Sequence, residues 1–304
     1  MTRIDALLIL VVVIWGANFS VVKAAIQEVP PQAFNAVRMV VASATFALLL
    51  VAARRFTTGR RGPDAGPGLF DDRAPLGWND WVRCAMLGAV GHFVYQVAFI
   101  GGVARTSVAN SSLILGSTPV AVGLLSAALG HERIGRAHWA GAALSVCGIY
   151  LIAGRGASLG SASAAGDLLM LVALACWSVY TVGSKPLLKR HSALVVTGWS
   201  MAVGTVLYVA VSLPQVLATE WATVSWTAWA ALVGSALLAL NVSYLIWYVA
   251  VQRIGSARTS IASNLVPVAA MVVAVLWLGE TVDGSQLAGA AAVLSGVAVS
   301  RLVK

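Results

Sequence analysis

Ten apolar runs, each about long enough to cross a bilayer, are the feature that most restricts how this chain can fold. Crossing the hydrocarbon takes about 20 apolar residues at about 1.5 Å of helix each. Suitable runs lie at residues 4–26, 32–53, 82–104, 106–129, 136–153, 166–186, 193–213, 227–250, 257–278 and 285–302. No apolar alternation with a period of two accompanies them, so a β-barrel is not supported. The sequence therefore predicts an all-α integral membrane protein with ten transmembrane helices.

The charged residues agree with this prediction and orient the chain. Only 10% of the residues are charged, against about 25% in soluble domains. The net charge of +9 does not indicate nucleic-acid binding, because the basic residues form no patch with interleaved aromatics. They lie at the ends of the apolar runs, and with the amino terminus inside, 16 of the 20 Lys and Arg residues are on the inner side and three on the outer. Basic residues favour the cytoplasmic side, which predicts a multi-pass protein of the cell membrane with both termini in the cytoplasm.

The second half of the sequence repeats the first. An offset of 162 residues aligns Asp5 with Asp167, Trp15 with Trp177 and Lys23 with Lys185. Further along, an offset of 148 aligns Trp78 with Trp226, Trp81 with Trp229, Arg105 with Arg253, Pro119 with Pro267, Glu132 with Glu280, Gly141 with Gly289, and Gly148 with Gly296. The smaller second offset means that the first half has the longer connection before its third helix, a Gly-, Pro- and charge-rich cytoplasmic loop at about 54–80.

Each half contains five spans, an odd number, so the second copy must enter the membrane from the opposite side. The predicted domains are residues 1–155 and 166–304, two inverted five-helix repeats around a central cavity. Inverted repeats are typical of secondary transporters that bind their substrate near the bilayer midplane. A duplicated fold without a transport role is the alternative.

Several segments resemble the EamA-type transporters of the drug/metabolite transporter superfamily. They are "IWGANFSVVK" in the first span, "STPV" in the fourth, "GHERIGRAHWAGAALSVCGIYLI" in the first half, and "LVPVAAMVVAVLWLGETVDGSQLAGAAAVLSGV" in the second. The resemblance covers nearly the whole chain. It implies ten helices, two repeats and a central cavity, and an exporter of amino acids, other metabolites or drugs.

A polar stripe in the third span points to the cavity. His92, Tyr95, Gln96 and Phe99 have the spacing i, i+3, i+4 and i+7, which places them on one helical face. Tyr95 is near the middle of the span, where an unpaired polar group exposed to lipid costs several kcal/mol. This face is therefore expected to point toward protein or water.

Three other spans carry similar faces, and a fourth segment supplies an amide. The full set of predicted substrate-binding residues is Trp15, Asn18, Phe19, His92, Tyr95, Gln96, Phe99, Trp177, Tyr180, Asn241, Tyr244, Tyr248 and Asn264. Hydrogen-bonded packing between helices is the alternative for any single face.

Two prolines and one arginine are also candidates. Pro119 and Pro267 occupy equivalent places in spans 4 and 9, where each removes a backbone donor and is expected to kink its helix at the cavity. Arg38 lies about 10 Å into the membrane. It could extend outward to the interface, cap helix carbonyls, or contact a substrate carboxylate.

The sequence favours a secondary transporter over other classes. It has no GxxxxGK[ST] phosphate loop, no metal site and no cofactor motif, and it lacks the acid–base constellation of an enzyme. Aromatic residues and amides with few charges suit a small neutral or zwitterionic solute, aromatic solutes included. We expect an exporter of metabolites such as amino acids that works by alternating access, with His92 as the candidate for proton coupling. A channel, or an exporter of hydrophobic drug-like compounds, is the alternative.

Overall fold

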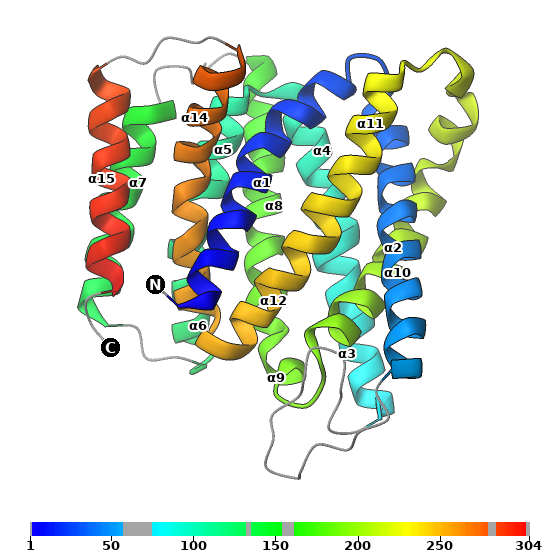
Figure 1. Cartoon of the computed structure of the whole chain (residues 1–304), viewed down its shortest axis with the longest axis horizontal. Coiled ribbons are helices and arrows are strands. Elements are labelled where there is room, and N and C mark those ends of the chain that lie inside the picture. Colours follow the sequence, from blue (N-terminus) through cyan, green and yellow to red (C-terminus); the bar gives the residue numbers. More distant parts are fainter. Residues whose placement is uncertain (1, 57–74, 132–134, 154–160, 279–283, 302–304) are drawn as a thin grey trace.

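The computed structural model describes residues 2–56, 75–131, 135–153, 161–278 and 284–301. This part of the chain is almost entirely helical and contains no β-strand (Figure 1). The elements are α1 (Arg3–Ala25), α2 (Pro31–Phe56), α3 (Trp78–Gly88), η1 (Ala89–Val94), α4 (Tyr95–Arg105), α5 (Val108–Gly116), α6 (Thr118–Ala128), α7 (Arg136–Ala153), α8 (Ser161–Gly183), α9 (Lys185–Leu188), α10 (Ala193–Ala218), η3 (Trp221–Thr223), α11 (Trp226–Ser235), η4 (Ala236–Val242), α12 (Ser243–Ile254), α13 (Ser256–Ser260), η5 (Ile261–Leu265), α14 (Val266–Leu278) and α15 (Gly284–Arg301). Each apolar run of the sequence overlaps at least one of these helices.

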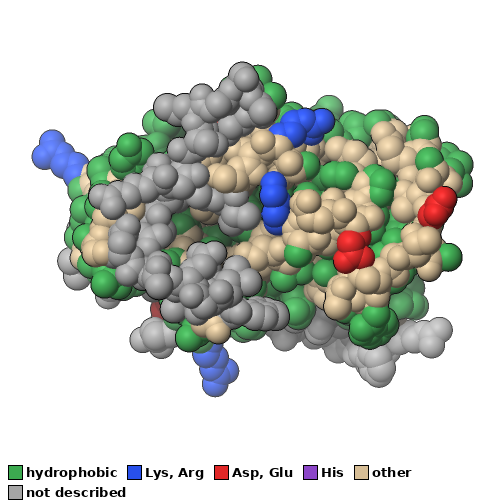
Figure 2. All heavy atoms as spheres, turned by 90° about the horizontal axis from the view of Figure 1, so that it is seen from above, with side chains coloured by type: hydrophobic (Ala, Val, Ile, Leu, Met, Phe, Trp, Pro, Cys, Tyr) green, Lys and Arg blue, Asp and Glu red, His purple; other side chains and the backbone are tan. Residues whose placement is uncertain are grey.

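The helices have the length and surface that a bilayer requires. Within the described residues, seven are long and apolar enough to cross a membrane: Arg3–Ala25, Pro31–Ala53, Trp78–Arg105, Asn110–Ala128, Ala164–Leu188, Ala193–Ala218 and Trp226–Ile254. Large apolar side chains such as Leu48, Val206 and Leu217 are well exposed. Seen from above in Figure 2, apolar side chains form much of the outline, and charged ones are scattered. The fold is that expected of a helical membrane protein.

Hydrogen bonds join one set of helix ends. Lys23 Nζ, near the end of α1, donates to the backbone oxygens of Val103 (2.6 Å) and Thr106 (3.0 Å). The side chains of Thr106 and Asn110 in turn donate to the carboxylate of Asp167. The ends of α1 and α4 therefore meet the start of α5 and the first turns of α8. We call this side of the molecule the Lys23 end.

A second network joins the other set of ends, which we call the His191 end. Asp80 in the first turn of α3 accepts a hydrogen bond from Arg190 (3.4 Å) and lies 3.1 Å from His191 Nε2. Gln252, near the end of α12, donates to the backbone oxygens of Leu188 and His191. The chain thus runs toward the Lys23 end in α1 and α4, and toward the His191 end in α8 and α12. Helices α1 and α8 therefore run in opposite directions, as do α4 and α12 (Figure 1).

Residues aligned by the sequence repeat contact one another across the two halves. Contacts of this kind, between a residue and its own counterpart, are also found at the centre of a two-fold dimer interface. The contacting pairs are Trp15 with Trp177 (ring centroids 5.5 Å), Ser43 with Thr205 (2.7 Å), Gln96 with Tyr244 (3.5 Å), and Ser145 with Val293 (3.5 Å). The first two pairs have the offset of 162 and the last two that of 148.

Glycines allow α7 and α15 to pack closely. A Cβ at Gly141 would lie 2.3 Å from the backbone oxygen of Gly296, and one at Gly148 would lie 2.6 Å from that of Gly289. Because Gly141 and Gly148 align with Gly289 and Gly296, each glycine faces the counterpart of the other. This crossed pattern is that of two antiparallel helices in close contact.

The third apolar segment of each half is interrupted by a π-helix at the same place. In the first half η1 lies between α3 and α4, and in the second η4 lies between α11 and α12. A π-helix within an α-helix is rare and often marks a functional site. At η1, Gly91 permits close packing, because a Cβ there would lie 2.3 Å from the ring of Tyr180.

Candidate functional site

A small cavity of about 70 Å³ lies between the two halves. Its lining comes from α1, α2, α4, α5, α6, α8, η4, α12, η5 and α14. The lining residues are Trp15, Asn18, Phe19, Arg38, Tyr95, Gln96, Phe99, Ser112, Leu115, Gly116, Thr118, Trp177, Ala239, Leu240, Tyr244, Ser263 and Val266. This volume holds a few water molecules, whereas pockets for small ligands measure about 300–1,000 Å³. A solute can enter only if the surrounding side chains move apart.

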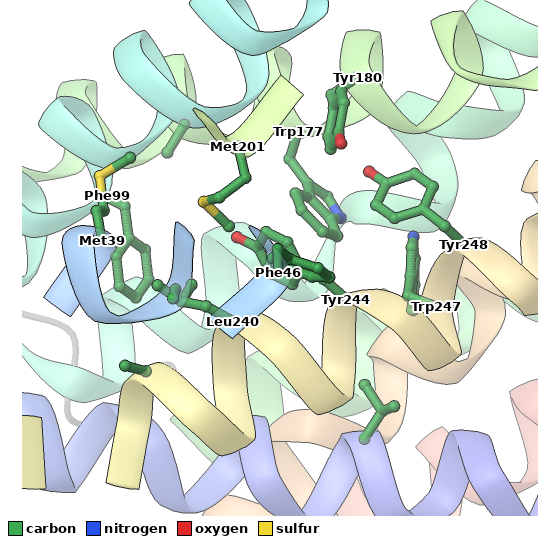
Figure 3. Close-up of a cluster of buried hydrophobic side chains, with 14 of the residues drawn as sticks. Met39, Phe46, Phe99, Trp177, Tyr180, Met201, Leu240, Tyr244, Trp247 and Tyr248 are labelled. Carbon is green, nitrogen blue, oxygen red and sulfur yellow. The ribbon is translucent and has the colours of Figure 1, made fainter. Parts of the chain in front are cut away.

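Aromatic rings form one wall of the cavity. Trp15 contacts Trp177 edge-on, and its ring centroid lies 6.2 Å from that of Tyr244. The rings of Trp177 and Tyr244 are 5.1 Å apart. Figure 3 shows Trp177 and Tyr244 with Trp247 next to them, and the rings of Trp177 and Trp247 are 5.8 Å apart. These rings offer flat apolar faces to a ligand.

Polar side chains occupy other positions of the lining. Asn18, Arg38 and Gln96 are each buried, with Arg38 only 1% exposed. The Arg38 guanidinium donates from Nη1 to Asn35 Oδ1 at 3.1 Å, and Gln96 Nε2 lies 3.5 Å from the Tyr244 hydroxyl. The lining therefore combines six aromatic side chains with one cation, two amides, three Ser or Thr hydroxyls and several small or aliphatic residues.

The structure brings together eight of the thirteen predicted substrate-binding residues as lining of one cavity: Trp15, Asn18, Phe19, Tyr95, Gln96, Phe99, Trp177 and Tyr244. Arg38, the predicted carboxylate contact, also lies in the lining. These residues come from α1, α2, α4, α8 and α12, so helices far apart in the sequence converge on this point.

Five predicted residues are placed outside the lining. Three of them pack together on the other side of the cluster: His92 Nε2 lies 3.3 Å from Ser200 Oγ, and the Tyr180 hydroxyl lies 2.6 Å from the same oxygen. The ring of Tyr248 lies 4.8 Å from that of Tyr180. Asn241 donates from Nδ2 to the backbone oxygen of Ala42 at 2.9 Å, which joins η4 to α2. Asn264 in η5 is fully buried and likewise outside the lining.

The two prolines follow breaks in the α-helix. Pro119 is the second residue of α6, after the turn at Ser117 that ends α5. Pro267 is the second residue of α14, after the 3₁₀ segment η5. The carbonyl of Leu115 accepts a hydrogen bond from Thr118 Oγ1 at 2.5 Å, so a side chain satisfies a backbone group beside the break.

Eight further residues of the lining were not singled out from the sequence as substrate-binding: Ser112, Leu115, Gly116, Thr118, Ala239, Leu240, Ser263 and Val266. The hydroxyl-rich stretch before Pro119 could have indicated Ser112 and Thr118. Ala239 and Leu240 carry no such signal, because apolar residues in a membrane helix resemble those that face lipid. In the described part of the chain, no group of three or more His, Cys, Asp or Glu residues could hold a metal ion.

Comparison with known proteins gives consistent matches along the whole chain. The model of a family described as "EamA-like transporter family" matches residues 2–154 and again residues 164–302. A protein of Streptantibioticus cattleyicolor named "Probable terminal-alkyne amino-acid exporter" is 31% identical over 95% of this chain and 90% of its own length. A "Probable amino-acid metabolite efflux pump" of Salmonella typhimurium is 26% identical over 99% and 95%, respectively. A solved crystal structure with 20% sequence identity has the same fold, with a TM-score of 0.76 over 99% of this chain and 97% of that one.

Proposed function

The chain belongs to the EamA-like transporter family, and from that premise we propose that it is a secondary transporter that exports amino acids or similar small metabolites by alternating access. The observation that carries the proposal is the position of the cavity. Trp15 with Trp177 and Gln96 with Tyr244 are pairs of repeat counterparts in contact, and all four residues line the cavity. A site beside the axis that relates two inverted copies can be exposed to either side when the copies exchange conformations.

We further propose ten transmembrane helices arranged as two inverted five-helix repeats, residues 1–155 and 166–304. Three observations support this arrangement. The family model matches the chain twice, once in each half. The helices α1 and α8 run in opposite directions, as do α4 and α12. The π-helical segments η1 and η4 fall at equivalent places.

The lining supports a small solute with an apolar part. Trp15, Trp177 and Tyr244 can stack against an apolar or aromatic side chain, while Asn18 and Gln96 can hydrogen-bond a polar group. The predicted residues outside the lining, such as His92 and Tyr180, would act on the substrate through the packing of the aromatic cluster. A purely hydrophobic drug-like compound would leave the amides and Arg38 without partners, so it fits the lining less well.

The decisive measurement is counterflow into proteoliposomes that contain the purified protein. Vesicles loaded with one unlabelled amino acid at a time should accumulate the external labelled form when that amino acid is a substrate, and the initial rate should saturate. Protein-free liposomes and vesicles loaded with buffer alone are the controls. Linear flux without counterflow would indicate a channel and reject the carrier.

The orientation can be tested in the same way as the topology of other membrane proteins. We propose that the protein resides in the cell membrane with both termini in the cytoplasm, supported by the distribution of Lys and Arg. A reporter active only in the cytoplasm should give signal when fused to either terminus. Signal from one terminus alone would contradict an even number of spans.

A further inference from the structure

Arg38 is a buried cation with few hydrogen-bond partners. Of the five N–H groups that a guanidinium carries, the hydrogen bond from Nη1 reaches Asn35, and Nε has no partner. Across the described ranges, no carboxylate lies within ion-pair distance of Arg38. An uncompensated charge is costly at such a depth, and intramembrane charged residues usually contact a partner or a substrate. Arg38 is one of the residues that line the cavity.

Two amide oxygens in the same lining are also unsatisfied. Asn18 Oδ1 and Gln96 Oε1 are buried and accept no hydrogen bond from the described residues. Both are acceptors only, so the group that satisfies them must be a donor, such as a solvent molecule or an ammonium. The lining therefore combines a donor of Arg38 with acceptors of Asn18 and Gln96, none of which has a hydrogen-bond partner among the described residues.

We propose that Arg38 binds the carboxylate of the transported solute, and that the Asn18 and Gln96 amide oxygens accept hydrogen bonds from its ammonium group. The inference rests on the proposed transport function and specifies its substrate class: zwitterions with a free carboxylate and a free amino group. The side chain of the solute would lie against Trp15, Trp177 and Tyr244. Simple amines, esters and neutral lipophilic compounds are poorer ligands, because each leaves the Arg38 charge without a counter-ion.

The repeat argues against a purely architectural reason for this charge. The counterpart of Arg38 in the second half is Ser200, which is fully buried and contacts His92 and Tyr180. The fold thus accommodates a small neutral side chain at the equivalent position. Of these two aligned positions, only the one that lines the cavity carries a positive charge.

The first arm of the test is a ligand series in proteoliposomes. The labelled amino acid with the largest counterflow among the twenty standard ones is chosen as the parent. Its methyl ester, its decarboxylated amine and its N-acetyl derivative then compete with it, because these share the side chain and differ only at the charged groups. We expect the ester and the amine to inhibit at least about tenfold more weakly than the unlabelled parent, as for the loss of a charged hydrogen-bonded pair. Equal inhibition by the ester or the amine would overturn the role of Arg38.

The second arm uses variants of the protein. Arg38→Gln should raise the concentration of parent needed for half-maximal counterflow by about tenfold to a hundredfold, and it should abolish the preference for the parent over its ester. Arg38→Lys keeps the charge and should retain that preference. Arg253→Gln is the matched control, because it removes an exposed arginine at the His191 end and should leave both quantities unchanged. Asn18→Leu should raise the concentration of parent needed for half-maximal counterflow, but it should not change the inhibition by the N-acetyl derivative.

Thermal unfolding in detergent separates a binding role from a structural one. An unpaired buried charge contributes no stability, so Arg38→Gln should unfold at the same temperature as the wild type or higher. A lower unfolding temperature with an unchanged ester preference would assign Arg38 to packing and overturn the proposal. Failure of the wild type to exchange any amino acid would instead reject the proposed function. The wild-type and variant results therefore distinguish the two failures.

Discussion

The two sides of the aromatic cluster are related by the sequence repeat but filled differently. On the Arg38 side, which we call the hollow side, Asn18, Phe19 and Phe99 line a cavity. Their counterparts are Tyr180, Thr181 and Trp247, with Ser200 in the place of Arg38. Tyr180 and Trp247 are larger than Asn18 and Phe99, and each is fully buried. Together with His92 and Tyr248, they form what we call the packed side.

The comparison teaches that a repeated backbone does not require repeated chemistry. Arg38 lies seven residues after Pro31, and Ser200 seven residues after Ala193, so the two sides are about equally deep from opposite ends of the molecule. The hollow side faces the Lys23 end and the packed side faces the His191 end. With the orientation proposed above, the packed side faces the cytoplasm, and the aromatic cluster separates the cavity from it.

The largest expected effect on stability is that of a substitution on the packed side. Trp247→Ala removes a side chain whose ring lies 5.1 Å from Trp15 and 5.8 Å from Trp177, and it should lower the free energy of unfolding by about 3–5 kcal/mol. Phe99→Ala, its counterpart on the hollow side, should cost less because its ring already borders empty space. Thermal unfolding in detergent measures both. Equal losses would contradict the distinction between the two sides.

A single added methyl group should show how tightly the packed side is filled. Gly91→Ala places a Cβ against the Tyr180 ring on the packed side, and overpacking of this kind costs about 1–3 kcal/mol. The control is Gly234→Ala in α11, where nothing lies within 4 Å of the added atom. Removing glycine from a helix there should stabilise the protein by about 0.5–1 kcal/mol. If Gly91→Ala were equally harmless, Tyr180 would not be tightly held.

The helices themselves could be predicted from the sequence, because few structures other than helices of about 20 apolar residues can cross a bilayer. The residues of the candidate site could be predicted from the sequence only in part. Faces were assigned by assuming 3.6 residues per turn, and this works for α1, where Trp15, Asn18 and Phe19 all line the cavity. Whether any lining residue binds substrate stays a prediction.

The assumption fails where the helix becomes π-helical. His92 lies in η1, and Tyr95 and Gln96 follow it in α4. A π-helical turn holds more residues than an α-helical turn, and one additional residue rotates the side chains before it by about 100° relative to those after it. His92 therefore points toward Ser200, while Gln96 points into the cavity. Asn241 in η4 is displaced in the same manner and reaches Ala42 in α2. The sequences of η1 and η4 do not predict this wider turn, since it depends on packing against neighbouring helices.

The smallest expected effect separates the two tryptophans that meet beside the axis. Trp15 Nε1 donates to the backbone oxygen of Ala239 at 3.2 Å, which fastens α1 to the π-helical segment of the other half. The indole N–H of Trp177 makes no such bond to any residue within the described ranges. Trp15→Phe should therefore lower the free energy of unfolding by about 0.5–1.5 kcal/mol more than Trp177→Phe, because both changes remove similar ring area. Chemical unfolding of the two variants side by side measures the difference. A larger loss for Trp177→Phe would mean that the bond to η4 contributes little, and that ring packing alone holds the two halves together at this point.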